Sequence, residues 1–289
     1  MRLNSNTMPA PHTEIPQYAD MLRLDNQGFV VLGAGQGIGE QVSHALAQSG
    51  AELMCVDFDA GRAETVAAAV GGQACVADIT RADDVQRVFG AARQRFGNRF
   101  KGLVDVVGVP VGGGLAAMDP AQWQRQFDLV VGHAWLALQL AVPLMQANGG
   151  GSMVFIGSMA GAVPRSGSLL AYGAAKAALH HLVKSAAQEF AGAGIRINAV
   201  APGLTRTPRL QDANGEEFWQ AQSASIPLGR PALTADIAAS VLYLCTALSR
   251  HVTGNIVLVD GGASLGSAAN LGIAKSEPAA RRSDGASRE

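Results

Sequence analysis

The sequence of 289 residues predicts an α/β fold with a doubly wound, seven-stranded parallel sheet and helices on both faces. Short apolar runs rich in Val and Ile alternate with longer helical patterns, which is typical of βαβ units. A glycine cluster follows the first run, as expected where a strand turns tightly into a helix. No long linker interrupts the alternation, so we expect one domain over residues 26–266. An N-terminal extension over 1–25 would precede it, and a tail over 267–289 has the composition of a disordered segment.

The seven runs are the expected strands. Each is bounded by Gly, Asp or Pro, which predicts strands buried on both faces of the sheet. Right-handed crossovers would bring their carboxyl ends to one edge, where open α/β sheets bind ligands. The strands are expected at 28–33, 52–57, 73–78, 102–108, 152–157, 195–201 and 255–261, and the helices at about 37–49, 59–70, 82–96, 119–147, 171–192 and 234–248.

Charge and hydropathy exclude several partners. The formal net charge is −1 and basic residues do not cluster, so no nucleic-acid partner is expected. No apolar run reaches the roughly 20 residues of a membrane span. The nearest is "LALQLAVPLM" (136–145), which Pro143 interrupts, so we expect no membrane partner.

The cysteines and the N-terminus indicate the compartment. Cys55, Cys75 and Cys245 lack metal-ligand spacing, so we expect core thiols and no metal site. The N-terminus has no charged-then-apolar signal pattern. We therefore expect a cytoplasmic protein.

A glycine-rich loop, "GAGQGIG" (33–39), follows the first strand. Its spacing is G-x-x-x-G-x-G, with Gly35 as an extra glycine. Glycines let the backbone approach a pyrophosphate, and the helix N-terminus supplies N–H donors and positive dipole. The alternative is that a tight strand–helix turn requires glycine for structural reasons alone. The cofactor residues predicted in this loop are Gly33, Gln36, Gly37, Ile38 and Gly39.

Asp57 ends the second strand, 18 residues after the loop's last glycine. A carboxylate there accepts hydrogen bonds from the adenosine ribose hydroxyls. It would also repel the 2′-phosphate of NADP, and no Lys or Arg occurs at 56–59, so we predict NAD as the cofactor. The alternative is that Asp57 only caps the next helix, with Asp59 as a rival for that role.

Asp78 ends the third strand in "ADIT" (77–80). An acid at this edge of the sheet could receive the adenine amino group. Capping of the helix that starts near Ala82 is an alternative role, and the two are compatible.

Tyr172 and Lys176 lie four residues apart in "AYGAAKAAL" (171–179), so a helix would place them on one face. A nearby cation favours the phenolate and lowers the pKa of a tyrosine from about 10, which makes it a usable general base. The Y-x-x-x-K pattern by itself also occurs by chance. Ser158 strengthens it, because this residue ends the fifth strand and could hold a substrate oxygen.

The segment "NAVAPGLTRTP" (198–208) follows the sixth strand to the same edge. Pro202 and Gly203 would turn the chain there. Thr205 and Thr207 could hydrogen-bond the carboxamide of a nicotinamide.

In order and spacing, these motifs resemble the short-chain dehydrogenase/reductase family in its single-domain branch, over about residues 25–265. The resemblance implies a Rossmann-like fold and reversible hydride transfer between NAD and a carbonyl or alcohol carbon of a small molecule. Tyr172 would be the general acid/base, Lys176 would lower its pKa and hold the nicotinamide ribose, and Ser158 would orient the substrate. A homotetramer or homodimer is implied, with the helices near 119–147 and 171–192 forming one interface. The resemblance rests on "GAGQGIG" (33–39), "VDFD" (56–59), "ADIT" (77–80), "IGSMAG" (156–161), "YGAAK" (172–176), "INAVAPGLTRT" (197–207), "IPLGRP" (226–231) and "VTGNIVLVDGG" (252–262). It adds Phe58, Ile79 and Gly108 to the expected cofactor contacts.

The sequence departs from the family pattern at three places. Leu32 precedes the glycine loop where Thr is common, and "DVVG" (105–108) replaces Asn-Asn-Ala-Gly. Val130 occupies the position of an Asn that bends its helix and holds a water linking the lysine to solvent. We expect valine to do neither. His133 is expected to be a helix-surface or interface histidine, with a part in the proton relay as the alternative.

The substrate segment is expected at about 205–228, where Leu210, Phe218 and Trp219 suggest an apolar wall. A hydrophobic or alicyclic secondary alcohol is therefore favoured. No arginine stands out as a partner for a substrate carboxylate, although Arg165, Arg206 and Arg209 are candidates.

The first functional hypothesis is an NAD-dependent enzyme. Val130 motivates the second, a catalytically weakened NAD-binding sensor or subunit partner. An epimerase or dehydratase would usually need a larger substrate domain than this chain offers.

Overall fold

The computed structural model describes residues 15–164 and 169–266, and its main sheet has seven parallel strands in the order β3-β2-β1-β4-β5-β6-β9. The predicted fold class is therefore confirmed. The order reverses between β1 and β4, which places a topological switch point at the carboxyl end of β1. The strands are β1 (Gly28–Leu32), β2 (Glu52–Asp57), β3 (Gln73–Val76), β4 (Phe100–Asp105), β5 (Gly151–Ile156), β6 (Ile195–Pro202) and β9 (Ile256–Val259).

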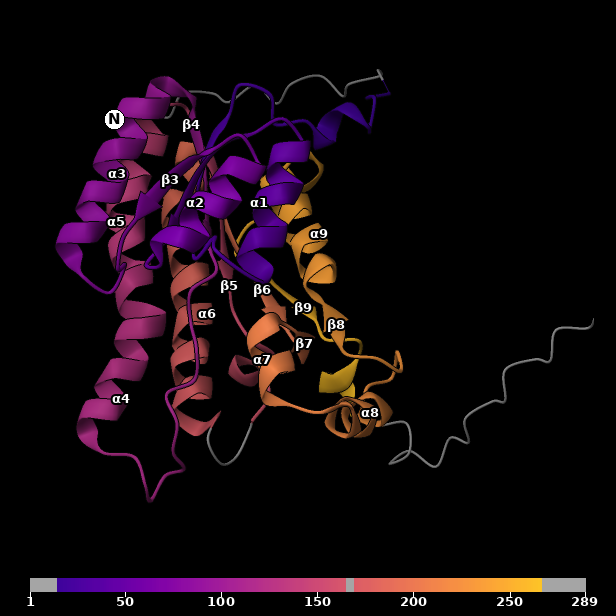
Figure 1. The fold of residues 1–289 in the computed structure, drawn as a ribbon. Coiled ribbons are helices and arrows are strands. Elements are labelled where there is room, and N and C mark those ends of the chain that lie inside the picture. The colour runs from indigo at the N-terminus through magenta and orange to yellow at the C-terminus, as the bar shows by residue number, and fades with distance from the viewer. Residues whose placement is uncertain (1–14, 165–168, 267–289) are drawn as a thin grey trace, which may run out of the picture.

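Helices cover both faces of this sheet (Figure 1). Two separate hydrophobic clusters fill the space between the sheet and the helices. One contains residues of α1 (Ile38–Gln48), α2 (Ala60–Ala69) and α9 (Thr234–Cys245). The other contains residues of α3 (Ala82–Phe96), α5 (His133–Ala147) and α6 (Leu170–Phe190).

Burial of the strands depends on their place in the sheet. All five residues of β1 are buried, as predicted. Every residue of the edge strands β3 and β9 keeps some exposure, so the expectation of burial on both faces is wrong there. An edge strand has a neighbour on one side only and less helix above it.

One continuous helical stretch, Pro120–Ala147, precedes β5 and contains α4 (Pro120–Phe127), the π-helical turn η3 (Asp128–Gly132) and α5. Pro143 lies inside α5 without ending it. These 28 residues have a mean hydropathy of 1.5 in their most apolar window, so the helix is long and apolar enough to cross a bilayer. The apolar run at 136–145, taken alone, did not suggest this. This is weak evidence, because a core helix meets the same criterion, and α5 packs here against α3 and α6.

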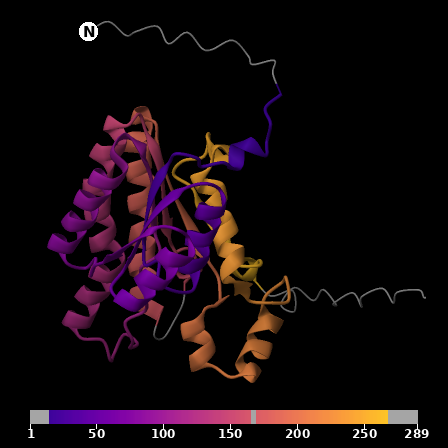
Figure 2. The same cartoon turned by 45° about the horizontal axis from the view of Figure 1, so that its top comes forward.

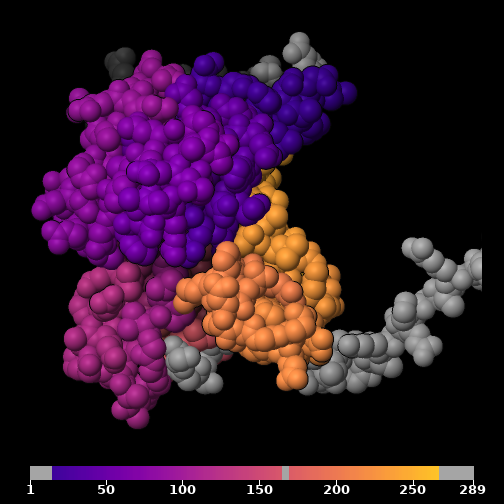
Figure 3. Space-filling view, in the orientation of Figure 1, coloured from indigo at the N-terminus to yellow at the C-terminus, as the bar shows by residue number. Residues whose placement is uncertain are grey.

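The chain after β6 forms a lobe that the sequence predicted only as a substrate segment. It contains α7 (Pro208–Ala213) and α8 (Glu216–Ser225), which stand away from the sheet in Figure 2 and border the main body in Figure 3. A short parallel ladder between β7 (Thr205–Arg206) and β8 (Ala232–Leu233) closes the base of the lobe.

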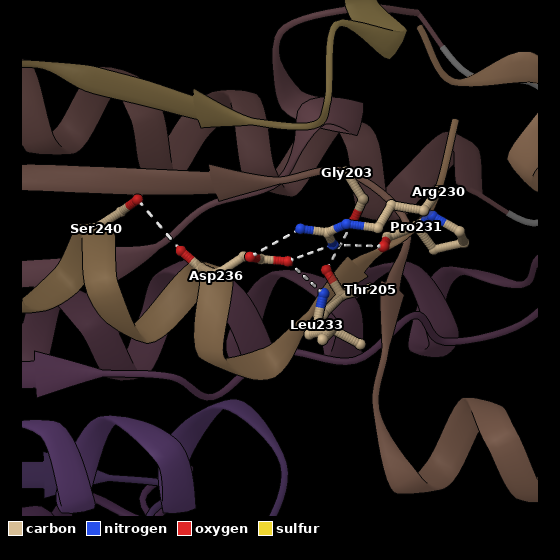
Figure 4. Close-up of polar contacts among 7 residues, drawn as sticks. All are labelled: Gly203, Thr205, Arg230, Pro231, Leu233, Asp236 and Ser240. Carbon is tan, nitrogen blue, oxygen red and sulfur yellow. Dashed lines mark hydrogen bonds and ion pairs between the residues drawn. The ribbon is translucent and has the colours of Figure 1, made fainter. Parts of the chain in front are cut away.

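An ion pair anchors this ladder to α9 (Figure 4). Both terminal nitrogens of Arg230 contact the carboxylate of Asp236, at 2.6 and 3.1 Å. The same carboxylate accepts the backbone N–H of Leu233 at 2.7 Å. Because Leu233 belongs to β8, the Asp236 carboxylate fixes the end of the lobe to the start of α9, where the chain re-enters the main domain.

The ends of the domain are only partly described. Leu24, within the predicted extension, is 1% exposed and packs in the α1 cluster. Residues 1–14 and the predicted disordered tail lie outside the described residues. Cys55 and Cys245 are buried and Cys75 is half-buried, and all three are free thiols. The described residues contain no group of three or more potential metal ligands.

Candidate active site

A cleft of about 310 Å³ lies at the carboxyl ends of β1 to β4. It collects ten of the predicted cofactor residues, which come from five separate segments of the chain. These are Gly33, Gln36, Gly37, Ile38, Asp57, Phe58, Asp78, Ile79, Gly108 and Thr207. The residues that line the cleft but were not predicted as cofactor contacts are Val56, Arg62, Ala77, Thr80, Val106, Val107, Val109, Leu129, Pro208 and Arg209.

The glycine loop is held by close backbone contacts. Gly33 has a φ of +79° and Gly37 a φ of +63°, conformations that favour glycine. Gly39 does not line the cleft. A Cβ there would lie 1.9 Å from the Gly33 carbonyl oxygen, so this glycine permits α1 to pack against the turn.

Asp57 is tied to the glycine loop, and Asp59 caps the helix. The Asp57 Oδ2 accepts the backbone N–H of Gly35 at 2.9 Å, and its Oδ1 accepts that of Asp59 at 3.1 Å. Asp59 accepts the backbone N–H of Arg62 and is the N-cap of α2. The capping alternative for Asp57 is therefore wrong. Arg62 itself lines the cleft, although it stands five residues after Asp57 and so outside the segment 56–59 that is free of basic residues.

Asp78 forms a local turn at the edge of the cleft. Its carboxylate accepts from both the backbone N–H and the hydroxyl of Thr80, at 3.0 and 2.7 Å. The N-cap of α3 is Arg81, without a side-chain cap. Asp78 is therefore not the helix cap, and it lines the cleft.

Ser158, Tyr172 and Lys176 lie close together. The Lys176 Nζ lies 5.6 Å from the centroid of the Tyr172 ring, and the Ser158 side chain is near enough to act on the pKa of the tyrosine hydroxyl. Burial raises the pKa of Tyr172, while Ser158 and the charge of Arg209 act in the lowering direction. The predicted net lowering of this pKa is therefore wrong for the protein without ligands. Burial also lowers the pKa of Lys176 to about 8, and the Asp105 charge opposes this.

His180, which the sequence did not single out, contacts the backbone of Ser158. The Ser158 backbone N–H points at the His180 Nε2 at 3.4 Å. Burial, then the charges of Lys176 and Lys184, lowers the pKa of His180 to about 4, so its ring is neutral at physiological pH. In the sequence, the one sign of a role for His180 is its spacing of four residues from Lys176, which places both side chains on one face of the helix.

The helix around Val130 is irregular despite the valine. A π-helical turn covers Asp128–Gly132, and Val130 is fully buried at its centre. The helix therefore departs from regular α-helical geometry at this position although it carries a valine. Wide turns of this kind are frequent at functional sites.

His133 is buried, so its expected place at the helix surface or an interface is wrong. It is 2% exposed, and its Nε2 lies 2.8 Å from the Oδ2 of Asp105, which is 3% exposed. Helical spacing could not reveal this contact, because the two residues are 28 positions apart.

The loop after β6 brings only one of its predicted residues to the cleft, Thr207. Pro202 pairs with β9 as the last residue of β6, and Gly203 packs against the backbone of Asp260. The Thr205 hydroxyl donates to the Gly203 carbonyl at 3.1 Å.

The lobe residues pack among themselves. Trp219 is 2% exposed and does not line the cleft. The Arg206 guanidinium lies 4.9 Å from its ring centroid and pairs with Glu216. Arg209, by contrast, lines the cleft and has no ion pair among the described residues. The third candidate arginine, Arg165, lies outside the described residues.

Comparisons with known proteins agree on one family. A family model described as enoyl-(acyl carrier protein) reductase matches residues 33–264. The chain is 34% identical over 250 residues to 2-(S)-hydroxypropyl-CoM dehydrogenase 3 of Xanthobacter autotrophicus, covering 83% of this chain and 97% of the relative. It is 33% identical over 252 residues to 7α-hydroxysteroid dehydrogenase of Escherichia coli, covering 84% and 96%. A solved structure of a 7α-hydroxysteroid dehydrogenase, complexed with NADH and 7-oxo glycochenodeoxycholic acid, matches with a TM-score of 0.79 and 32% identity, covering 84% and 96%.

Proposed function

The chain belongs to the short-chain dehydrogenase/reductase family, and from that premise we propose that it is an NAD-dependent oxidoreductase acting on a secondary alcohol or ketone. The observation that carries the proposal is the position of the Lys176 ammonium 5.6 Å from the Tyr172 ring, with the Ser158 side chain near enough to lower the pKa of the tyrosine hydroxyl. Gly108 connects this group to the cleft, because it lines the cleft and its Cβ position is 2.7 Å from the Lys176 Nζ.

The residues of the cleft fit a nicotinamide dinucleotide. Gly33 and Gly37 line the cleft at the N-terminus of α1, where no side chain stands between the backbone and a bound pyrophosphate. The apolar side chains of Val56, Ala77 and Ile79 offer a surface for an adenine ring. The NADH in the matched 7α-hydroxysteroid dehydrogenase structure supports the same assignment.

When bound, the nicotinamide accepts or donates the hydride. In alcohol oxidation, the Tyr172 phenolate would take the proton of the substrate hydroxyl as general base, and in reduction the phenol would return it. Ser158 would hold the substrate oxygen beside Tyr172. The Lys176 charge would stabilise the phenolate and so offset the burial that raises the pKa of Tyr172.

NAD is the proposed cofactor because Asp57 lies in the cleft next to the glycine loop. One oxygen accepts the Gly35 N–H, which fixes the carboxylate where the ribose hydroxyls of an adenosine would bind. Arg62 lines the same cleft five residues after Asp57 in the chain, and its guanidinium could attract a 2′-phosphate. The carboxylate is 8% exposed and held at both oxygens, whereas the Arg62 side chain is 43% exposed, so we give Asp57 the greater weight.

We propose a hydrophobic or alicyclic secondary alcohol as the substrate. Support comes from the apolar residues Val109, Leu129 and Pro208 in the lining of the cleft, and from the similarity to a hydroxysteroid dehydrogenase. The packed interior of the lobe does not supply the apolar wall that the sequence suggested.

The test is a panel of cyclic and aromatic secondary alcohols and their ketones, offered with NAD and with NADP, while the absorbance of the reduced nicotinamide is followed. Turnover of at least one alcohol with NAD is expected. The second candidate, a catalytically weakened NAD-binding sensor, rests on Val130. It would gain if NAD binds by calorimetry while no alcohol or ketone in the panel reacts.

A homotetramer or homodimer in the cytoplasm completes the proposal. Trp123 on α4 and Trp135 on α5 are 41% and 50% exposed, which suits helices that meet a second copy of the chain. Light scattering of the purified protein tests the assembly, and a monomer would contradict it.

A further inference from the structure

The Lys176 side chain ends in the protein interior, where an ammonium needs partners. Its Nζ donates to the Ile156 carbonyl oxygen at 2.6 Å, and the residue is 1% exposed. A Cβ at Gly108 would lie 2.7 Å from this Nζ, so the backbone of Gly108 borders the ammonium. An ammonium carries three hydrogens, and the carbonyl takes one. A buried cation in such surroundings requires a counter-charge.

One buried carboxylate supplies that charge. Asp105 ends β4, the neighbour of the strand that ends at Ile156, and is 3% exposed. Its charge raises the pKa of Lys176 against the effect of burial. Among the described residues, Asp105 is the only acid found to act on Lys176.

His133 and the loop after β4 fix the Asp105 carboxylate. The His133 Nε2 lies 2.8 Å from Oδ2, and the Val107 backbone N–H donates to Oδ1 at 3.1 Å. The His133 Nδ1 faces a second acceptor, the backbone carbonyl of Asp128, at 3.3 Å. A hydrogen on Nε2 lets this ring nitrogen donate to the carboxylate, and the donated hydrogen bond leaves the charge of the aspartate in place. Both carboxylate oxygens are therefore occupied, and the carboxylate cannot turn freely.

The other titratable groups around Lys176 carry no negative charge at neutral pH. Tyr172 and His180 are on the same helix, and the Lys176 charge lowers the pKa of His180. Arg209, from α7, acts on Tyr172. Asp105 is thus the one group that can balance the lysine.

We propose that the buried Asp105–His133 pair is the counter-charge of Lys176, and that both are positioning residues which keep the ammonium charged beside Tyr172. The proposal rests on the proposed function, because the charge of Lys176 matters there for the tyrosine. Val130 contributes no polar group to this arrangement. The pair therefore stabilises the charge of Lys176, a role to which a polar side chain at position 130 could otherwise contribute.

The kinetic test uses Asp105→Asn, which keeps the size of the side chain and an acceptor for the Val107 N–H but removes the charge. If the lysine pKa drops by about one unit from about 8, the charged fraction and with it kcat for alcohol oxidation should fall about twofold at pH 7 and about fivefold at pH 8. The alkaline loss of activity, expected in the wild type near the lysine pKa of about 8, should move to lower pH. Binding of NAD by calorimetry should stay within about threefold, which is a change of less than 1 kcal/mol.

Three further variants separate the electrostatic role from a structural one. Asp105→Glu retains the charge and should restore part of the activity, and His133→Phe should shift the alkaline limb in the same direction as Asp105→Asn. Asp83→Asn makes the same change on the exposed first turn of α3 and should leave the profile unchanged. An unchanged alkaline limb in folded Asp105→Asn would overturn the proposal. If Asp105→Asn does not fold, the alkaline limb of the pH profile of His133→Phe replaces it as the test, and an unchanged limb there would overturn the proposal.

A double-mutant cycle on thermal unfolding tests the pair without turnover. Asp105→Asn and Lys176→Met should be coupled at neutral pH and uncoupled well above pH 8, where native Lys176 is neutral. Absence of coupling at neutral pH would contradict the counter-charge. If the wild type oxidises no alcohol but the coupling is present, the proposed function fails and the counter-charge stands.

Discussion

The Asp57 carboxylate accepts the backbone N–H of Gly35 at 2.9 Å, which joins the end of β2 to the glycine loop after β1. A Cβ at Gly35 would lie 2.6 Å from the Asp57 Oδ2. The acid and the loop therefore form one unit, and the position of the carboxylate in the cleft depends on glycine at residue 35.

Replacing this acid should change the choice of cofactor. In Asp57→Ala, kcat/KM with NAD should fall about tenfold to a hundredfold through loss of hydrogen bonds to charge, each worth ~1.5–3 kcal/mol. The activity with NADP should rise relative to NAD, because Arg62 then faces the cleft without the carboxylate. Steady-state kinetics with both cofactors measures the ratio. Adding Arg62→Ala should reverse the gain with NADP, and a wild type that prefers NADP would contradict the role of Asp57.

Gly39 should tolerate no side chain. Its Cβ position is 1.9 Å from the Gly33 carbonyl oxygen, and backbone cannot move away cheaply. Gly39→Ala should therefore cost about 1–3 kcal/mol of unfolding free energy and weaken NAD binding. Gly90, in α3, has open space around its Cβ position, so Gly90→Ala should stabilise by about 0.5–1 kcal/mol. Urea unfolding compares the two, and equal stability of the variants would count against the tight turn.

Tyr172→Phe should remove turnover and spare the cofactor. Without the hydroxyl there is no proton acceptor beside Ser158, so kcat should fall by a factor of about 100 or more. Calorimetry should show NAD binding close to that of the wild type. Tyr243→Phe, which changes a tyrosine 39% exposed on α9, should keep full activity. Substantial turnover by Tyr172→Phe would refute the assigned general base.

Lys176 should make stability depend on pH. Its pKa falls from 10.5 to about 8 on folding, because burial disfavours the charge. Between these values the unfolded chain binds more protons than the native protein, so the free energy of unfolding rises with pH by up to ~3 kcal/mol. Burial raises the pKa of Cys55 and Cys245, which opposes this rise from about pH 9 upward.

The difference between wild type and Lys176→Met isolates the lysine. The variant should be more stable than the wild type at neutral pH, and the gap should close as the pH rises from 8 towards 10.5. Thermal unfolding at several pH values measures this gap. A gap that does not change with pH would show that the native lysine is not desolvated.

The sequence by itself determined the seven strands, the glycine loop, the acid at the end of β2, and the helix that carries Tyr172 and Lys176. Each of these is encoded locally. Strands and helices have their own hydrophobic periods, and neighbouring turns of a helix bring residues four apart together.

Only the tertiary structure decided which distant groups meet. Asp105 and His133 are 28 residues apart, and the parallel sheet with its covering helix buries them together. Arg62 and Arg209 reach one cleft from separate helices, while Trp219 turns into the lobe. The helix after residue 119 could be predicted, but the π-helical turn around Val130 could not. Such contacts depend on how whole elements pack, and a pKa depends on the charges and burial that packing creates around the group.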